Sequence, residues 1–448
     1  MRRYPDFRRR AQIDEVQSHY ASAWLGYLSG ANGSDTTNRT HIVGATTQRL
    51  DLHVLKIALS ILSARHSILI AGVQTRGEQV WIRRGTSCEM TLELCDASLC
   101  SREERMEMAK VLLEERVWRP FEPSEPLSRA VVVDLGDGGF VIAIVVHHFV
   151  CDDISLSILR REFMFLYQSI AAGMRGSPLP AVELDYWDYL AAMQEWFASS
   201  PYRERLAYWV DKLTSYRSPP ITAPAELVAS AWTRLPFTIV PDLADRLRAI
   251  TTSCKMTLFG ILLAAHHALV SERLHQESSL ISSVTLGRDL PLLRNTFGRL
   301  IDRTFYRADG LSQSDDFLTI SKVKTSVREA THFSFVPAEL ISEALLQNEI
   351  VLCASVFNYR TGMTIARANN IDQPWRWFHL PRPARTSRLG TTVYEYWMEL
   401  SDGGTAGLQG IMRARSETAA ELAGKYTEIL ERFSRLRLDL SDNRAGAL

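Results

Sequence analysis

The chain has 448 residues, of which 46% are hydrophobic and 23% are charged, an ordinary globular composition with enough residues for two core-bearing lobes. Lysine plus arginine equals aspartate plus glutamate at 51 each, so no global field favours nucleic acid or an anionic membrane as a partner. No run of about 18 uncharged apolar residues occurs, and no membrane span is expected.

The N-terminus, residues 1–11, is basic and has no apolar stretch that would indicate an export signal, so we expect a solvated arm. Its five arginines are Arg2, Arg3, Arg8, Arg9 and Arg10. The six cysteines are scattered without a CxxC pair, which predicts reduced thiols in a cytoplasmic protein.

Periodicity predicts the elements of the first half. Leucines at helical spacing from Leu52 to Leu62 predict a helix with one buried face. Two β-branched runs flank the glycine-rich stretch 136–139, which predicts a hairpin whose second strand ends in two histidines. Apolar residues from Leu156 to Ile170 return to helical spacing, with an aspartate or serine just ahead as N-cap. The two histidines therefore lie where a strand gives way to a helix.

Proline-rich stretches at 176–190 and 217–227 mark the division of the chain. The second half opens with helix-like residues 242–274, followed by strands near 280–288, 351–360 and 392–401. We expect an N-terminal arm, an N-terminal lobe, a connection, a C-terminal lobe and a flexible tail. Their expected bounds are 1–11, 12–180, 181–227, 228–436 and 437–448.

The stretch VIAIVVHHFVCDDIS, Val141 to Ser155, carries the strongest candidate chemistry. An aspartate four residues after His148, where the chain turns into a helix, can fold back under the imidazole and fix a base. A zinc site of His147, His148 and Cys151 would need adjacent strand side chains, which point to opposite faces, to converge. A Cys151 nucleophile rests on one cysteine near one histidine. Purely structural histidines also remain an alternative.

A second pair, His266 and His267, serves as an internal control. It lies inside a leucine-rich helical segment, and Ser271 rather than an acid stands four residues after His267. We interpret it as core or helix surface.

The first pair matches a known signature. His147, His148, Asp152 and Ser155 fit HHxxxDGxS, and the chain resembles the condensation domains of nonribosomal peptide synthetases and, more distantly, chloramphenicol acetyltransferase-like acyltransferases. Asp153 stands where that family has glycine. Further segments agree in order, with an aspartate at 302 in place of the usual asparagine. They are Arg65-His66, RPFEPSEPLSRA, LAYWVDKL, MTLFGILLAAHHALV, GRDLPLLRNTFGRLIDRTFYR, SVFNYR and YEYWMELSDGGTAGLQGIM.

The resemblance implies an α/β fold of two chloramphenicol acetyltransferase-like lobes, mixed sheets flanked by helices, in a V-shaped pseudo-dimer with the active site in the interlobe tunnel. The catalytic motif residues would be His148, His147 and Asp152, of which His148 would face the reacting atoms. Asp152 would also form a structural ion pair with Arg288 across the lobes. The substrate-tunnel candidates are Asp153, Ser155 and Asn358. No metal or cofactor is expected to be bound, because a carrier protein presents the donor on its 4′-phosphopantetheine.

The expected function is a stand-alone condensation enzyme of secondary-metabolite or antibiotic biosynthesis. It would transfer a thioester-bound acyl or aminoacyl group directly to an amine or hydroxyl acceptor, carrier-bound or free. No carrier-protein serine motif or adenylation signature is found, so the donor is expected in trans. The alternatives are a coenzyme A-dependent acyltransferase and a non-catalytic docking domain. A monomer that binds neither nucleic acid nor membrane is expected.

Asp153, the clearest departure from the family, has two interpretations. It caps the following helix by accepting from a backbone N–H near Ser155 or Leu156. Alternatively, its carboxylate lines the tunnel and selects a cationic or hydroxylated acceptor, or narrows the channel against a bulky one.

Overall fold

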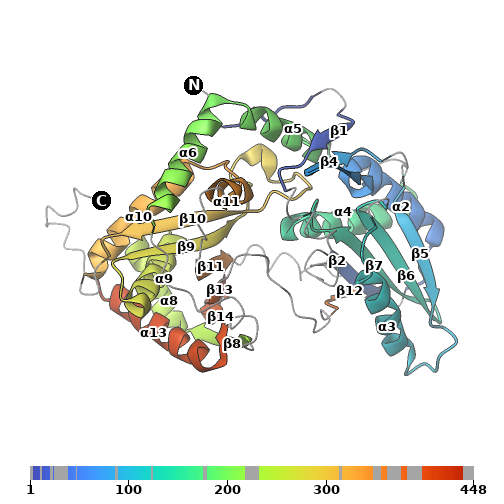
Figure 1. The fold of residues 1–448 in the computed structure, drawn as a ribbon. Helices are drawn as coiled ribbons and strands as arrows, with labels where there is room; N and C mark the ends of the chain where they lie inside the picture. The colour runs from blue at the N-terminus through green and yellow to red at the C-terminus, as the bar shows by residue number, and fades with distance from the viewer. Residues whose placement is uncertain are drawn as a thin grey trace. The chain divides into compact units, whose positions relative to one another are not determined.

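The computed structural model forms two compact units (Figure 1). Unit 1 comprises Met1–Ser199, Leu286–Ile301 and Asn370–Arg388, and unit 2 comprises Ser200–Thr285, Asp302–Asn369 and Leu389–Leu448. The residues that the structure describes are 4–10, 13–20, 24, 39–46, 48–85, 89–122, 125–174, 179–216, 232–311, 315–346, 355–360, 375–380 and 396–436.

Unit 1 is built on a mixed five-stranded sheet. The order is β12 (Trp375–Phe378), β2 (Arg39–Thr46), β7 (Gly139–His147), β6 (Ser128–Gly136), β5 (Thr91–Asp96). Only β5 and β6 pair in parallel. A smaller antiparallel sheet has the order β1 (Glu15–Gln17), β4 (Gln79–Arg83), β3 (Gly72–Arg76).

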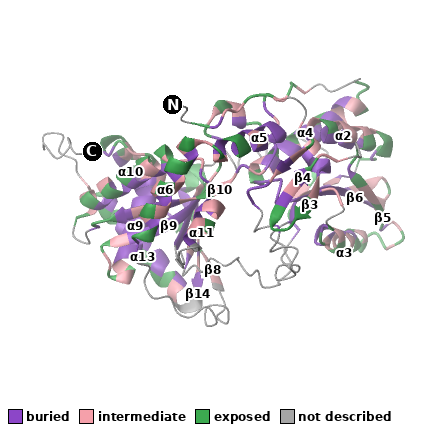
Figure 2. Cartoon of the chain, turned by 45° about the horizontal axis from the view of Figure 1, so that its top comes forward, coloured by how far each residue is buried: buried purple, intermediate pink, exposed green. Residues whose placement is uncertain are grey.

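The central strand β7 is buried on both faces, which explains its unbroken apolar run. On one face Val141, Ala143 and Val145 join the core formed with α3 (Arg105–Val117). The alternate residues point to the other face, where α4 (Asp153–Ala171) packs against α2 (Leu52–Arg65) and β2. In Figure 2 the buried residues of unit 1, drawn in purple, gather in its interior. The strand therefore runs through the core of unit 1 and ends at His147, with His148 directly after it.

The hairpin predicted at residues 136–139 is confirmed. Gly136 pairs with Gly139, and the two residues between them, Asp137 and Gly138, have φ values of 53° and 83°. Positive φ at both central positions is the geometry of a type I′ turn, which matches the twist of the flanking strands.

Unit 2 is built on a mixed six-stranded sheet. The order is β10 (Asp302–Asp309), β9 (Ser278–Thr285), β11 (Ser355–Arg360), β13 (Trp397–Asp402), β14 (Leu408–Arg415), β8 (Trp232–Ile239). Strand β11 pairs in parallel with both β9 and β13. The helices described in this unit are α6 (Ser200–Thr214), α8 (Pro241–Ser253), α9 (Leu258–Leu274), α10 (Asp316–His332), α11 (Ala338–Leu346) and α13 (Ser416–Ser434).

The helix-like stretch 242–274 is two helices rather than one. Helix α8 ends at Ser253, Lys255 adopts a φ of 47°, and the Thr257 side chain caps α9 by accepting from the N–H of Gly260. Helix α9 is buried along most of its length. In the described part of the chain no single helix is long and apolar enough to cross a membrane. Helices α8 and α9 have the required length and hydropathy only when taken together, and they are bent by 104° relative to each other.

The bounds of the units differ from the expected lobes. Residues Leu286–Ile301 belong to unit 1 although they follow the first strands of unit 2 in sequence. The N-terminal arm is not simply solvated: the backbone N–H of Arg10 donates to Asp188 at 2.8 Å, and its guanidinium pairs with Glu195 at 2.8 Å, both on α5 (Tyr186–Phe197). The proline-rich stretch 217–227 and the tail 437–448 lie outside the described residues.

Candidate active site

The two histidines occupy different environments. His147 is the last residue of β7 and is 2% exposed; its ring contacts those of Trp24 and Phe121. Its Nδ1 accepts from the backbone N–H of Phe149 at 3.0 Å. His148 lies just beyond the strand and is only half-buried. His147 is therefore part of the core, whereas His148 is the accessible member of the pair.

The imidazole of His148 is held in one tautomer. Its Nδ1 lies 2.6 Å from the carbonyl oxygen of Cys151, and because a carbonyl only accepts, Nδ1 carries the proton. Burial, followed by the positive charge of Arg299, lowers the pKa of His148 to about 4, against smaller opposing effects of the Cys151 carbonyl and of Asp153 and Asp152. At neutral pH the ring is uncharged. Among the described residues no group hydrogen-bonds Nε2, so that nitrogen is available as a proton acceptor.

Asp152 is fully buried at 0% exposure and organises the start of α4. Its carboxylate forms a bidentate pair with Arg288, with Nη1–Oδ2 at 2.7 Å and Nη2–Oδ1 at 3.0 Å. Oδ1 also accepts from the N–H of Ser155, and Oδ2 accepts from the N–H groups of Leu300 and Ile301 at 3.0 and 3.3 Å. The predicted ion pair is present, but Arg288 lies in unit 1, so the pair fastens segment 286–301 within that unit.

Ser155, expected as a tunnel residue, is completely buried. Its hydroxyl donates to the carbonyl of Gly298 at 2.7 Å and accepts from the Gly298 N–H at 2.9 Å and from Arg288 at 3.1 Å. A Cβ on Gly298 would come within 2.1 Å of the Tyr186 ring, and one on Gly287, where φ is 65°, within 2.0 Å of the Leu300 carbonyl. The serine thus joins segment 286–301 to α4, and the two motif glycines allow the close contacts of the segment with Tyr186 of α5 and with its own Leu300.

The capping role expected for Asp153 is wrong. The N-cap of α4 is Asp152, whose side chain accepts from Ser155, and Asp153 is the first residue of the helix. Asp153 is exposed, and its negative charge acts on His148. The cap falls one residue earlier because Asp152 has the extended backbone, with φ −123° and ψ 177°, that an N-cap adopts.

Two further motif residues lie in unit 2 and have structural contacts there. The Oδ1 of Asn358, a tunnel candidate that is 8% exposed, accepts from the N–H of Val284 at 3.0 Å and links β11 to β9. Asp302, which replaces the family's asparagine, accepts at 3.3 Å from the N–H of Ala338 at the start of α11. Since an amide oxygen could accept the same bond, this substitution leaves the contact intact.

The structure argues against a Cys151 nucleophile and against a zinc site at the histidine motif. Cys151 is 0% exposed, and burial, with the nearby Asp152 charge, raises the pKa of its thiol well above the ordinary value, so it is a poor nucleophile. Across the described ranges, no three histidine, cysteine, aspartate or glutamate side chains are grouped to hold a metal ion. The control pair is core: His266 and His267 hydrogen-bond Ser355 and Ser279, each at 2.5 Å.

Sequence reasoning missed two charged residues. Glu162 of α4 binds both Arg65, at 2.9 Å, and His66, at 2.7 Å, and so joins α4 to α2. A glutamate on the apolar face of a predicted helix was the available signal. Arg299, whose charge acts on His148, is the one charged residue in the stretch FGRLI, residues 297–301.

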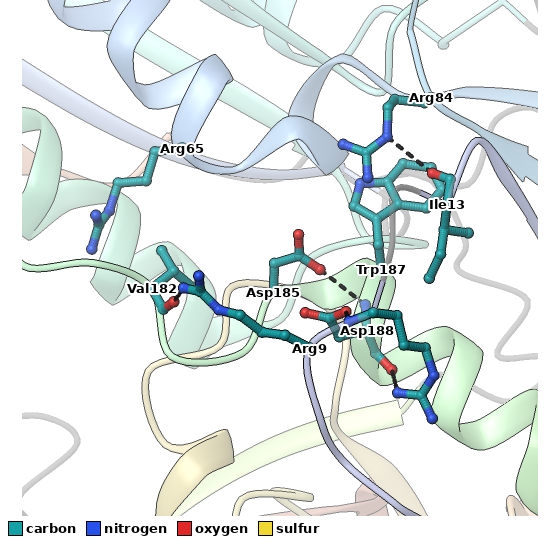
Figure 3. Close-up of a pocket in the computed structure, with 9 residues that line it drawn as sticks. Arg9, Ile13, Arg65, Arg84, Val182, Asp185, Trp187 and Asp188 are labelled. Atoms are coloured by element: carbon teal, nitrogen blue, oxygen red, sulfur yellow. Dashed lines mark hydrogen bonds between the residues drawn. The ribbon is translucent and has the colours of Figure 1, made fainter.

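A cavity of about 440 Å³ opens elsewhere in unit 1 (Figure 3). It is lined by Arg9, Arg10, Ile13, Arg65, Arg84, Val182, Asp185, Trp187 and Asp188. Within it the Arg84 guanidinium lies over the Trp187 ring at 4.7 Å and donates to the Ile13 carbonyl at 3.0 Å. None of the lining residues belongs to the histidine motif, so we do not place the chemistry there.

Known proteins share sequence similarity with this chain. The family model for the condensation domain matches residues 31–367. Chondramide synthase cmdD of Chondromyces crocatus is 27% identical over 339 residues, which are 74% of this chain and 9% of that protein. Cyclosporin synthetase simA of Tolypocladium inflatum is 27% identical over 350 residues, 74% of this chain and 2% of that protein. The chain therefore spans less than a tenth of these relatives.

Solved structures share the fold. The X-domain from teicoplanin biosynthesis matches with a TM-score of 0.76 and 18% identity, covering 96% of this chain and 97% of that one. The first condensation domain of the CDA synthetase matches with a TM-score of 0.62 and 16% identity, covering 95% and 97%. The predicted α/β fold of the chloramphenicol acetyltransferase type is thereby confirmed.

Proposed function

Since this chain belongs to the condensation-domain family, we propose that it transfers an acyl or aminoacyl group from a carrier-protein thioester to an amine or hydroxyl acceptor. The observation that carries the proposal is the neutral imidazole of His148, with its proton fixed on Nδ1 by the Cys151 carbonyl and Nε2 left open. Such a ring accepts a proton without first having to lose one.

The proposed reaction is one direct transfer. The acceptor nitrogen or oxygen attacks the thioester carbonyl, the new C–N or C–O bond forms, and the C–S bond breaks. Nε2 of His148 takes the proton from the acceptor and returns it to the departing thiolate. An amine needs mainly positioning, whereas an alcohol depends more on this proton transfer. Neither Cys151 nor Ser155 is placed as a nucleophile, because both are buried, which supports transfer without an acyl-enzyme.

Membership of the condensation-domain family supports a proposal for the donor and the cellular setting. We propose that a carrier protein presents the acyl group on its 4′-phosphopantetheine, in cytoplasmic secondary-metabolite biosynthesis. A coenzyme A donor would serve the same chemistry. The experiment is intact-mass detection of product from candidate carrier-bound acyl thioesters, and from the matching coenzyme A thioesters, each offered with amine and hydroxyl acceptors. Product from the coenzyme A thioesters alone would reject the carrier-protein donor.

A second candidate is a docking module that recruits another enzyme. The observation that favours it is Asp153, a carboxylate at the family's glycine position whose charge acts on His148, in a fold similar to the X-domain from teicoplanin biosynthesis, which has been solved in complex with OxyB. Retention of both motif histidines supports catalysis instead. Failure of every acyl donor, together with tight binding to a partner enzyme by a correctly folded His148→Ala variant, would favour docking.

A further inference from the structure

Arg299 carries a charge that the described part of the protein does not neutralise. Its guanidinium carbon lies 4.0 Å from the centre of the Tyr20 ring, which is a cation–π contact. Its Nε is buried without a hydrogen-bond partner, and no described carboxylate lies within ion-pair distance of it. Buried polar atoms of this kind are usually satisfied, so an unpaired one calls for an explanation.

Arg288, on the same segment, shows what a structural arginine looks like here. Its two terminal nitrogens bind both carboxylate oxygens of Asp152 and also donate to the carbonyls of Leu286, Thr296 and Gly298. Both terminal nitrogens of Arg288 are therefore bound by the fold, although its Nε, like that of Arg299, is buried without a hydrogen-bond partner. Among the described residues the terminal nitrogens of Arg299 have no such acceptors, so its charge is available for a group that this part of the protein does not supply.

The backbone of Arg299 is fixed from both sides. The N–H of Gly298 donates to Ser155 at 2.9 Å, and the N–H of Leu300 donates to Asp152 at 3.0 Å. The carbonyl of Arg299 accepts from the hydroxyl of Tyr186 at 2.9 Å. The arginine is therefore anchored to the motif that carries His148, and a rigid backbone is what a binding group needs.

The charge of Arg299 also acts on three histidine rings. Besides Tyr20, its field reaches His19, His147 and His148, and in each case it lowers the pKa of the imidazole after the larger effect of burial. The carboxylates of Asp152 and Asp153 act on His148 as well, but Asp152 is already paired with Arg288 and no ion pair joins Arg299 to a described carboxylate, so an incoming anion would be favoured there.

We propose that Arg299 binds a carboxylate of the acceptor, beside the amine or hydroxyl group that His148 deprotonates. The fork of the guanidinium matches a carboxylate through two parallel hydrogen bonds. The acceptor class is then a free amino acid or hydroxy acid, or a molecule with a carboxylate near its nucleophile. The proposal rests on the proposed function for the identity of the acceptor, but the anion site can be tested without turnover.

The test follows the Cε1–H NMR signal of His148, assigned by its loss in His148→Ala, during titration with acetate and with acetamide. We expect a saturable shift with acetate and none with acetamide. Arg299→Gln should weaken acetate binding about 10- to 100-fold, the loss of a charge-assisted hydrogen-bonded pair, and Arg299→Lys should weaken it less. Arg294→Gln, an exposed arginine on the same segment, is the matched control and should bind acetate as the wild type does.

Equal acetate binding by Arg299→Gln and the wild type would overturn the proposal, as would equal shifts with acetamide. If Arg299→Gln does not fold, Arg299→Met keeps the apolar stem over Tyr20 and replaces it. In turnover, the variant should raise KM for an amino acid acceptor and leave KM for its amide unchanged. An equal fall in kcat for both acceptors, with KM constant, would instead assign Arg299 to the acyl oxygen. Acetate binding without any turnover would retain the site and reject the proposed reaction.

Discussion

The carboxylate of Asp152 and the guanidinium of Arg288 form a completely enclosed bidentate pair, with side chains 0% and 5% exposed. Removing one partner leaves the other charge buried and unpaired. We expect Asp152→Asn and Arg288→Gln each to lower the free energy of unfolding by about 3 to 5 kcal/mol, measured by urea denaturation. The double variant should lose less than the sum of the two. Strict additivity, or a loss no greater than that of the exposed control Asp153→Asn, would contradict a coupled buried pair.

Ser155 should behave as a structural residue. Because its hydroxyl is enclosed and bonded to Gly298 and Arg288, Ser155→Ala should cost about 1 to 3 kcal/mol in the free energy of unfolding. Acceptor preference should not change. A variant of wild-type stability with altered preference would return Ser155 to the substrate-binding surface.

Substitution of each histidine in turn should affect different properties, turnover for His148 and stability for His147. His148→Ala should retain the fold and lower turnover by about 10²- to 10⁴-fold, more for a hydroxyl acceptor than for an amine. His147→Ala empties a core site lined by Trp24 and Phe121 and should cost about 2 to 4 kcal/mol in stability. Circular dichroism and urea denaturation measure the fold, and product mass measures turnover. Full turnover by a folded His148→Ala protein would refute the role of His148 as base.

Asp153→Gly restores the family residue. Since Asp152 supplies the cap, Asp153→Gly removes the favourable interaction of Asp153 with the helix dipole, about 0.3 to 1 kcal/mol. We expect a changed preference among cationic, neutral and anionic acceptors at nearly constant melting temperature. Asp153→Asn, which keeps the volume and removes the charge, distinguishes an electrostatic effect from a steric one. Identical preferences in all three proteins would leave Asp153 outside substrate selection.

Local patterns predicted much of this site and its scaffold. The glycine-rich turn at 136–139, the helix from Leu52 and the placement of His148 at the end of a strand follow from periodicity and turn chemistry. The pairing of Asp152 with Arg288, 136 residues apart, came from the family resemblance, because no local rule links them.

What depended on tertiary context could not be predicted in the same way. Asp152 and Asp153 are adjacent, and either could cap α4. The extended backbone of Asp152 makes it the N-cap, and the sequence does not show this backbone conformation. The break of residues 242–274 into two helices occurs at Lys255, which has no strong helix-breaking character by itself. Arg299 was not predicted as a site residue. Its buried Nε has no hydrogen-bond partner among the described residues, and the sequence alone does not show this.

The pH dependence should follow His148. Its pKa in the folded protein is about 4, below the ordinary 6.5, so the neutral base persists well below neutrality and kcat/KM should fall with an apparent pKa near 4. The unfolded chain binds this proton more readily than the folded one. The stability contributed by the neutral ring is therefore complete above about pH 6.5 and is lost as the pH falls towards 4. Urea denaturation at each pH monitors that loss while activity is measured.

Two substitutions should shift the acidic limb of the kcat/KM profile, where activity falls at low pH, in opposite directions. The positive charge of Arg299 lowers the pKa of His148 and the negative charge of Asp153 raises it. Arg299→Gln should therefore shift the limb of the kcat/KM profile to higher pH, and Asp153→Asn should shift it to lower pH. Both profiles are measured with the same neutral amine acceptor, so that binding of a substrate charge does not contribute. A limb near pH 6.5 in the wild type, or one that neither substitution moves, would show that a group other than His148 controls the reaction.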